Sequence, residues 1–450
     1  MVKFRYVILI ICFVFSCKQT NTPESTSLRP NIVLIMADDL GYETIWANGG
    51  RSYQTPALNR MASEGMRFEH CYAQPLCTPS RVQLMTGIYN VRNYVRFGLL
   101  DEGQTTFGHL FQKAGYRTCV VGKWQLGKDS GSPQKAGFDN HCLWQVTQGR
   151  VDSIGRDTRF SQPVLEIDGI VKTFKETDYG PEIVSDYGLD FIEKSHQSGK
   201  PFLLYYPMIL THCPFSPTPN SPEWNQDTTA VMSYKGEEDY FGDMVFQMDE
   251  IVGKINNKLK QLGLENNTLV IFTGDNGTDE PVISTINGRQ IAGAKGKSTD
   301  AGTRVPLIVK WPEVIPSNSA NNDLIDFSDF LPTLGEVADI KLDSLDIDGI
   351  SFLPQLKGEL GNPREWIYSW YSREGKVPEA RIFARNHQFK LYTTGEFYDV
   401  PKDYEEQSPL DTSNLDSDVK EIYGKLKGVL QNFSERRLDM VHVLNKENDL

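Results

Sequence analysis

The most reactive pattern in this chain is the pentapeptide 77–81, Cys-Thr-Pro-Ser-Arg. A helix is expected to start here, because Thr78 is a good N-cap and Pro79 suits the first helical turn. Cys77 then lies where unpaired backbone N–H groups and the positive end of the helix dipole face outward, which favours a tetrahedral oxyanion. Arg81, one turn later, projects to the same side and can hold residue 77 or an anionic substrate.

Two apolar runs, 31–36 and 268–272, predict buried central strands. Each is followed closely by oxygen-bearing side chains, namely Asp38 and Asp39 after the first and Asp275 and Asn276 after the second. One such acidic tip is usually a plain turn, but ligands of parallel sheets gather beyond the carboxyl ends of the strands. Adjacent carboxylates repel one another unless a cation neutralises them. Calcium suits these hard oxygen ligands, and magnesium is the alternative.

Three further segments with charged or titratable side chains follow the strand-like runs 116–121 and 202–206 or lie near the run 305–310. They contain Lys123 and Gln125 in GKWQLG, His212 in THCPF, and Lys295 in GAKG. A lone lysine is usually a solvated surface charge, and a lone histidine is usually only hydrogen-bonded. Their joint occurrence in this order makes that explanation improbable for the whole set.

In this order, the segments resemble the motifs of type I (formylglycine-dependent) sulfatases of the alkaline phosphatase superfamily, of the bacterial exported type that acts on carbohydrates. The family patterns are Cys-x-Pro-x-Arg, Gly-Lys-Trp-His-Leu-Gly, Thr-His-x-Pro-Phe and Gly-Gly-Lys-Gly followed by Glu-Gly-Gly-x-Arg-Val-Pro. The resemblance runs from about residue 31 to residue 306. In this register Lys295, not Lys297, takes the family's lysine position, and Asp300 replaces its glutamate.

The resemblance implies a set of site residues. The implied metal ligands are Asp38, Asp39, Asp275, Asn276 and residue 77, and the implied catalytic residues are Cys77, Arg81, Lys123, His212 and Lys295. Substrate binding falls to Gln125, Lys123, His212 and Lys295, with Arg289 added as a nearby loop residue. The resemblance also implies that a sulfatase-maturating enzyme converts Cys77 to 3-oxoalanine (formylglycine) before export, since folding would bury the site.

By this resemblance, one hydroxyl of the hydrated formylglycine attacks sulfur, and the alcohol leaves with a proton from His212. The second hydroxyl then loses its proton, and the hemiacetal collapses and expels sulfate. The family usually gives this deprotonation to a histidine at the position of Gln125, and glutamine cannot accept the proton. Three alternatives stay open: water or a metal-bound carboxylate takes over, His212 serves both steps, or turnover is slow. The preferred interpretation is that Gln125 only orients the hydrate.

The expected substrate is a sulfated polysaccharide or oligosaccharide attacked at its end, with broad arylsulfatase activity as the weaker expectation. Trp144 and His141, like Arg289, are expected in loops that could grip a sugar, although packing explains them equally well. Two other classes remain: a phosphatase or phosphonate hydrolase of the same superfamily, and a glycan-binding relative without catalysis. Gln125 is the only support for the last.

The strands and helices expected to carry these residues predict an α/β fold. Apolar strands alternate with helical stretches such as 239–262, which favours a large, mostly parallel, doubly wound sheet flanked by helices. We assign 31–350 to this catalytic domain. Short aromatic-rich strands and a final helix predict that 351–450 forms a smaller C-terminal subdomain with an antiparallel sheet.

The N-terminus predicts export. A basic start, a short apolar stretch and Cys17 make residues 1–17 similar to a bacterial lipoprotein signal, with plain secretion as the alternative. Residues 18–30 are polar and predict a flexible tether. We therefore expect a periplasmic or outer-membrane protein that is lipid-anchored at Cys17. The net charge of −13 argues against nucleic acid as a partner. The cysteines show no disulfide framework spacing.

Overall fold

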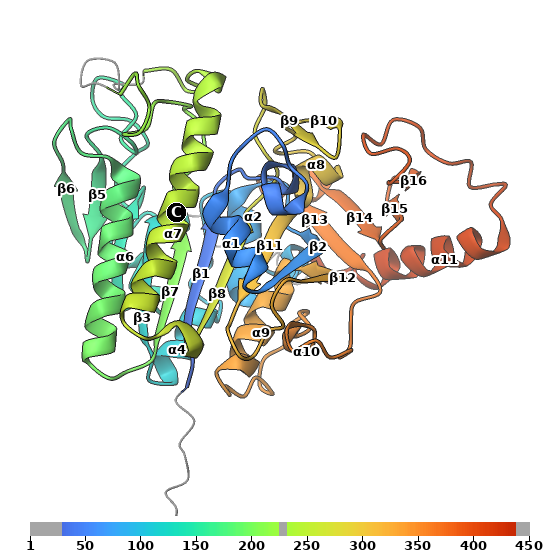
Figure 1. Cartoon of the computed structure of the whole chain (residues 1–450). Coiled ribbons are helices and arrows are strands. Elements are labelled where there is room, and N and C mark those ends of the chain that lie inside the picture. The colour runs from blue at the N-terminus through green and yellow to red at the C-terminus, as the bar shows by residue number, and fades with distance from the viewer. Residues whose placement is uncertain (1–28, 225–231, 438–450) are drawn as a thin grey trace, which may run out of the picture.

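The computed structural model describes residues 29–224 and 232–437 (Figure 1). The predicted signal 1–17, with Cys17, lies outside the described residues, as do positions 18–28 of the predicted tether. The end of the predicted tether packs on the domain, since Pro30 is buried and its carbonyl accepts a hydrogen bond from the Tyr116 hydroxyl at 3.1 Å. Within the described ranges, no helix has the length and apolar character needed to span a bilayer.

A ten-stranded sheet forms the centre of the molecule. Its spatial order is β12 (Ser319–Asp326), β2 (Met66–Tyr72), β11 (Arg304–Lys310), β8 (Thr268–Gly274), β1 (Asn31–Ala37), β7 (Phe202–Pro207), β3 (Arg117–Lys123), β4 (Asn140–Trp144), β5 (Val164–Ile167) and β6 (Ile170–Thr173). The run from β8 to β4 is parallel, which confirms the predicted fold class. β11 is the inner strand expected at 305–310, but it runs antiparallel to both of its neighbours.

Helices cover both faces of the sheet, so successive residues of β1 enter two different cores. Leu34 and Met36 pack toward the helices α2, α4 and α9, whereas Val33 and Ile35 pack toward α1, α6 and α7. The longer helices are α1 (Pro56–Ser63), α2 (Cys77–Thr86), α4 (Phe107–Lys113), α6 (Gly180–Gln197), α7 (Phe241–Gln261) and α9 (Phe330–Val337). The short ones are α3 (Asn90–Asn93), α5 (Ser132–Lys135), α8 (Asp300–Thr303) and α10 (Leu353–Leu356).

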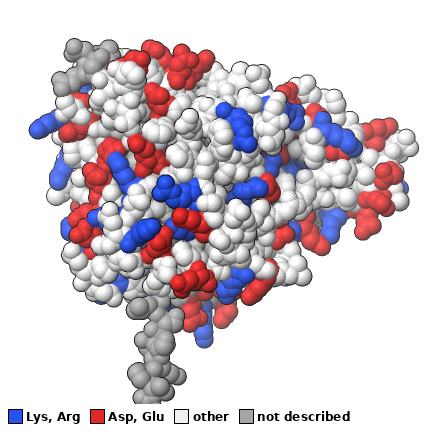
Figure 2. Space-filling view, viewed as in Figure 1, with Lys and Arg blue, Asp and Glu red and all other residues white. Residues whose placement is uncertain are grey.

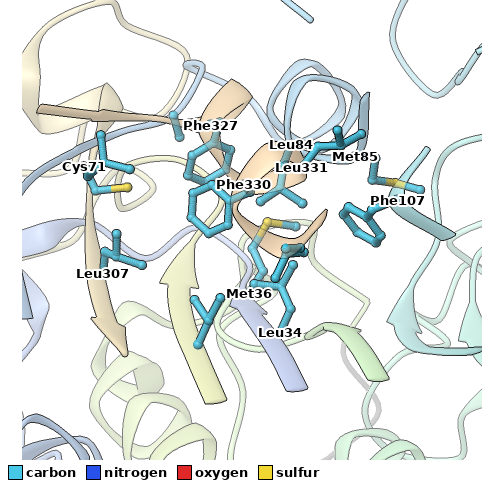
Figure 3. Close-up of a cluster of buried hydrophobic side chains, with 14 of the residues drawn as sticks. Leu34, Met36, Cys71, Leu84, Met85, Phe107, Leu307, Phe327, Phe330 and Leu331 are labelled. Carbon is cyan, nitrogen blue, oxygen red and sulfur yellow. The ribbon is translucent and has the colours of Figure 1, made fainter. Parts of the chain in front are cut away.

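The first of these cores seats helix α2. Figure 3 shows Leu84 and Met85 of α2 beside Leu331 of α9, with Leu34 and Met36 of β1 beneath them. Burying each such side chain contributes about 1.5–3 kcal/mol to stability. This packing fixes the N-terminal end of α2 near the carboxyl ends of the central strands.

Two smaller sheets flank the large one (Figure 1). A hairpin joins β9 (Ile283–Ile286) to β10 (Arg289–Ala292). The predicted C-terminal antiparallel sheet contains β13 (Ile367–Tyr371), β14 (Arg381–Arg385), β15 (Phe389–Tyr392) and β16 (Phe397–Asp399), followed by helix α11 (Ser417–Asn432). It lies beside α8, whose first residue, Asp300, forms a buried ion pair with Arg385 of β14.

Candidate active site

The acidic residues come together because β1 and β8 are adjacent and parallel, with Ala37 paired to Gly274. The residues that follow these two positions are therefore neighbours. The backbone N–H of Asp39 donates to Asp275 Oδ1 at 3.0 Å, and Asn276 Nδ2 donates to Asp39 Oδ1 at 2.9 Å. Asp38, Asp39, Asp275 and Asn276 are all fully buried.

This group fits a divalent cation. The Oδ1 atom of Asn276 is buried with no hydrogen-bond partner among the described residues, so one hard oxygen acceptor is left over. Burial and the neighbouring Asp38 raise the pKa of Asp275 to about 7, because buried carboxylates without a counter-ion disfavour one another's charge. The ligand atoms of Asp38, Asp275 and Cys77 all lie within 4.8 Å of one another. A cation would balance the buried carboxylates and take up the free amide oxygen.

Cys77 is the first residue of α2, so the prediction that Thr78 is the N-cap is wrong. Leu76 occupies the cap position in an extended conformation and makes no side-chain cap. The Thr78 hydroxyl instead accepts a hydrogen bond from the Gly98 N–H at 3.2 Å. The helix begins earlier than Thr78 because the residues around the cysteine are buried and fixed by tertiary contacts.

The Cys77 thiol is held between two polar groups. Its Sγ donates to Gln125 Oε1 at 3.1 Å, and Lys123 Nζ lies 3.6 Å from Sγ. Burial raises the pKa of the thiol, so the unmodified side chain is protonated and a weak nucleophile. Only 2% of Cys77 is exposed. An enzyme that needs the backbone around this residue to be accessible therefore has little surface to contact in the folded domain.

Two of the predicted cations brace the acidic group. Lys123 Nζ lies 2.7 Å and 3.0 Å from the carboxylate oxygens of Asp38. Arg81 is fully buried, and its guanidinium lies 3.2 Å from Asp275 and donates to the Lys123 carbonyl at 2.9 Å. Arg81, which has no exposed surface, thus supports the carboxylates of the cluster.

The other side of the site contains Lys295 and His212. Lys295 Nζ lies 2.5 Å from Asp39 Oδ2 and 3.0 Å from His212 Nε2. Burial and the charge of Lys295 hold the pKa of His212 well below its usual range, so the ring is neutral without substrate. Lys297 is on the surface, paired with Glu280 at 2.6 Å, so the structure also places Lys295 rather than Lys297 in the site.

Comparison with known proteins identifies the family of the chain. A family model described as sulfatase covers residues 30–340. The chain belongs to the sulfatase family. Mouse N-acetylgalactosamine-6-sulfatase is 32% identical over 361 residues, which cover 74% of this chain and 67% of that protein. Mouse arylsulfatase G is 29% identical, over 82% of this chain and 76% of that one. A second family model, the C-terminal part of N-sulphoglucosamine sulphohydrolase, matches residues 297–436.

A solved structure, Ps i-CgsB, superposes with a TM-score of 0.74 and 25% identity, covering 91% of this chain and 93% of that one. The same protein has been solved in complex with k-i-k-neocarrahexaose, with a TM-score of 0.73. These relatives confirm that the chain is a sulfatase, a hydrolase of sulfuric esters, with the predicted fold.

Sequence patterns missed one residue of this sulfatase's site, Arg159. Its side chain is buried, donates to Asp157 through Nε at 2.9 Å, and lies over the Trp144 ring at 4.3 Å. The Nη1 atom of Arg159 lies 2.9 Å from His212 Nδ1 and donates to the Cys213 carbonyl at 2.6 Å. Arg159 thus fixes the Nδ1 edge of the ring and leaves Nε2 facing Lys295. It follows no strand and belongs to none of the motifs, so no signal in the sequence marked it.

Other expected substrate contacts lie elsewhere in the sulfatase. Trp144 and His141 are buried in β4, not in a loop, so the expectation that they grip a sugar is wrong. Arg289 lies on β10 with its guanidinium over the Tyr404 ring at 4.8 Å. Its described contacts include none of the residues around Cys77. Asp300 is also outside the cluster and pairs with the C-terminal sheet.

The charges of the sulfatase's site are nearly balanced. Asp38, Asp39 and Asp275 oppose the cations Arg81, Lys123 and Lys295. A bound divalent cation leaves the cluster with a net charge of about +2, which attracts a singly charged sulfate ester. On the face shown in Figure 2, basic and acidic side chains are interspersed. The attraction for anions is therefore local to the site, in a protein of net charge −13.

Proposed function

We propose that this sulfatase removes sulfate from the terminal sugar of sulfated polysaccharides or oligosaccharides. The observation that carries the proposal is the convergence of four metal-binding side chains, Lys123, Lys295 and His212 on the side chain of Cys77. Two relatives support a sugar substrate, because one is named for N-acetylgalactosamine 6-sulfate chemistry and the other was solved with k-i-k-neocarrahexaose.

The proposed cofactors are calcium, with magnesium as the alternative, and formylglycine made from Cys77. Asp38, Asp39, Asp275, Asn276 and residue 77 would hold the cation. The free Oδ1 of Asn276 and the all-oxygen carboxylate set support calcium, which accepts irregular oxygen coordination. When present, the cation and the hydrated aldehyde supply charge neutralisation and an oxygen nucleophile for sulfur.

The chain's own residues then have distinct tasks. Lys123 and Lys295 are placed to hold the nonbridging sulfate oxygens, since each ammonium can donate three hydrogen bonds and only some are used by Asp38 and Asp39. Once a bound sulfate ester offsets the charge of Lys295, His212, fixed at Nδ1, can take up a proton from solvent at Nε2 and pass it to the bridging oxygen of the departing alcohol. Arg81 favours the ionised form of Asp275, with which it pairs at 3.2 Å.

Gln125 is proposed to orient the group at position 77. Its Oε1 atom already accepts a hydrogen bond from the Cys77 thiol at 3.1 Å, so the same amide can hold a hydroxyl there. It offers no basic atom. The second proton transfer therefore falls to water, a carboxylate or His212.

Burial of the site supports action at chain ends. Cys77 is 2% exposed and His212 is 7% exposed, so the reacting centre lies well below the surface. A terminal sugar can bring its sulfate group to such a buried centre, whereas the middle of a polymer would have to bend sharply to reach it.

We also propose that the protein is exported and anchored by lipid at Cys17, with Cys77 converted by a maturating enzyme beforehand. The sequence pattern of residues 1–17 supports export. Figure 1 adds a geometric argument, because the chain enters the domain at the start of β1, and the site lies at the opposite end of that strand. An anchored enzyme would thus present its site away from the membrane.

The test combines mass spectrometry of the peptide that contains position 77 with release of inorganic sulfate. We expect an aldehyde in place of the thiol, and sulfate from sulfated oligosaccharides but not after Cys77→Ala. Nitrophenyl sulfate, phosphate and phosphonate are compared in parallel. Faster hydrolysis of phosphate or phosphonate would instead favour the other hydrolases of the superfamily. Glycan binding without sulfate release would favour the non-catalytic alternative, for which Gln125 remains the support.

A further inference from the structure

A cavity of about 590 Å³ lies between the loop that follows Lys295 and the C-terminal sheet. Gly296 and Lys297 form one side, and Arg381 of β14 and Tyr392 of β15 form the other. This volume is within the range of about 300–1,000 Å³ that is typical of small-molecule sites. None of the residues named above for catalysis or metal binding lines it.

The cavity begins next to the reacting centre. Gly296 directly follows Lys295, whose ammonium lies in the site. The Gly296 N–H donates to the Pro75 carbonyl at 2.8 Å, two residues before Cys77. The cavity and the reacting centre thus lie on either side of the same loop, which places the cavity close to a sugar bound at Cys77.

One wall of the cavity is rigidly built. The Tyr392 hydroxyl hydrogen-bonds to Ser298 Oγ at 2.9 Å and to the carboxylate of Glu406. Lys390 also binds Glu406 and donates to the Ser298 carbonyl at 2.9 Å. The Tyr398 ring lies edge-on to Tyr392, with 6.0 Å between their centroids. The aromatic wall is thus positioned before any ligand arrives.

The mouth of the cavity offers both donors and acceptors. The exposed Arg381 guanidinium lies near Glu396 and helps to lower the pKa of that carboxyl, and no hydrogen bond joins it to another described residue, so it can donate to a ligand. Glu396 and Glu405 are exposed carboxylates on the lining, while Lys297 is neutralised by Glu280. Sugar hydroxyls can both donate and accept, and a pyranose face packs on tyrosine rings. The lining has three carboxylates, Glu396, Glu405 and Glu406, against two cations, Lys297 and Arg381, so its net charge disfavours a sulfate or a uronate.

We propose that this cavity binds the second sugar of the substrate, next to the sulfated one, and that this second sugar is uncharged. The inference rests on the proposed function as a carbohydrate sulfatase and adds a preference for the neighbour of the sulfated sugar. Arg381 and Glu396 contact its hydroxyls, and the tyrosines form the surface beside it.

The experiment compares sulfate release from mono- and disaccharides by the mature, metal-loaded enzyme. A panel of monosulfated hexoses and hexosamines first identifies the sugar that is hydrolysed fastest. Disaccharides then join this sugar to galactose or to galactose 6-sulfate. We expect the galactose disaccharide to have the higher kcat/KM. An equal or higher value for the doubly sulfated one overturns the choice of an uncharged sugar.

Two variants test the residues. In Arg381→Ala and Glu396→Ala, we expect the kcat/KM ratio of galactose disaccharide to monosaccharide to fall at least about tenfold, the effect of a lost hydrogen bond to a charged group. Lys402→Ala, an exposed lysine on the same subdomain that does not line the cavity, should leave the ratio unchanged. An unchanged ratio in both cavity variants overturns the proposal.

If the protein does not act on sulfated sugars, the result is different: no member of the panel releases sulfate. The cavity is then tested by saturation-transfer NMR with lactose as a neutral disaccharide probe. Contact with the wild type that is lost in Arg381→Ala supports a sugar site in this cavity. Absence of transfer to lactose in the wild type overturns it.

Discussion

Replacing Asp300 by asparagine tests how firmly the Lys295 loop is joined to the C-terminal sheet. Burial raises the pKa of Asp300, but the Arg385 guanidinium and the Lys390 ammonium outweigh it and lower the pKa to about 2, from 3.8. This difference of nearly two units is worth about 2.5 kcal/mol of stability at neutral pH. The variant also leaves the two buried cations underneutralised, and breaking such a pair costs about 3–5 kcal/mol. We expect a loss of about 2.5–5 kcal/mol.

The pH dependence has a defined sign. The folded pKa of Asp300 is below the unfolded one, so its contribution is fully present above about pH 4 and is lost as pH falls toward 2. The difference between wild type and Asp300→Asn should therefore be constant from pH 7 to pH 5. It should shrink at pH 3.5 and below, for as long as the wild type remains folded.

Urea unfolding followed by tryptophan fluorescence at pH 7, 5, 4 and 3.5 measures this difference. Glu365→Gln is the matched control, because it removes an ion pair with Lys425 on the same subdomain. The side chains of Glu365 and Lys425 are 68% and 53% exposed. Such surface pairs contribute little. If Asp300→Asn unfolds at the same urea concentration as the wild type at pH 7, the ion network does not stabilise the junction and the reasoning fails.

Three further predictions concern the site. Asn276→Leu should weaken calcium binding at least about tenfold in calorimetry on chelator-treated protein, and unchanged affinity would show that its free oxygen is not a ligand. Arg159→Lys should lower kcat about tenfold to hundredfold with little change in KM, because His212 loses its fixed partner; an unchanged kcat would contradict this. Gln125→His should raise the rate of sulfate release if the missing base limits turnover. A lower rate would mean that the amide's hydrogen bond to position 77 matters more.

The metal site could be predicted because each half follows a long apolar strand. Asp38 and Asp275 are marked by runs that must lie in the centre of a sheet, and parallel strands in register bring their ends together. Lys123 and His212 follow strands in the same way. Their placement needed only the hydrophobic pattern and the rule for parallel sheets.

Other features had no local signal. Arg159 reaches His212 from a segment 53 positions away that follows no strand. The partners of Asp300 lie 85 and 90 positions further along the chain, so its acidic side chain looked like a simple replacement for glutamate. Trp144 and His141 were expected in loops near the motifs, yet pairing with β3 makes them strand residues.

The pairing of β1 with β8 also determines how late in synthesis the site can form. The two halves of the acidic cluster are separated by 236 positions, so nothing encloses residue 77 until the ribosome has added about 200 residues beyond it. At roughly 5–20 residues per second, that interval lasts about 10–40 s. If Cys77 is converted to formylglycine as proposed, the modifying enzyme would meet an open nascent segment for a limited period, and slower elongation upstream of β8 should increase the fraction of molecules that emerge active.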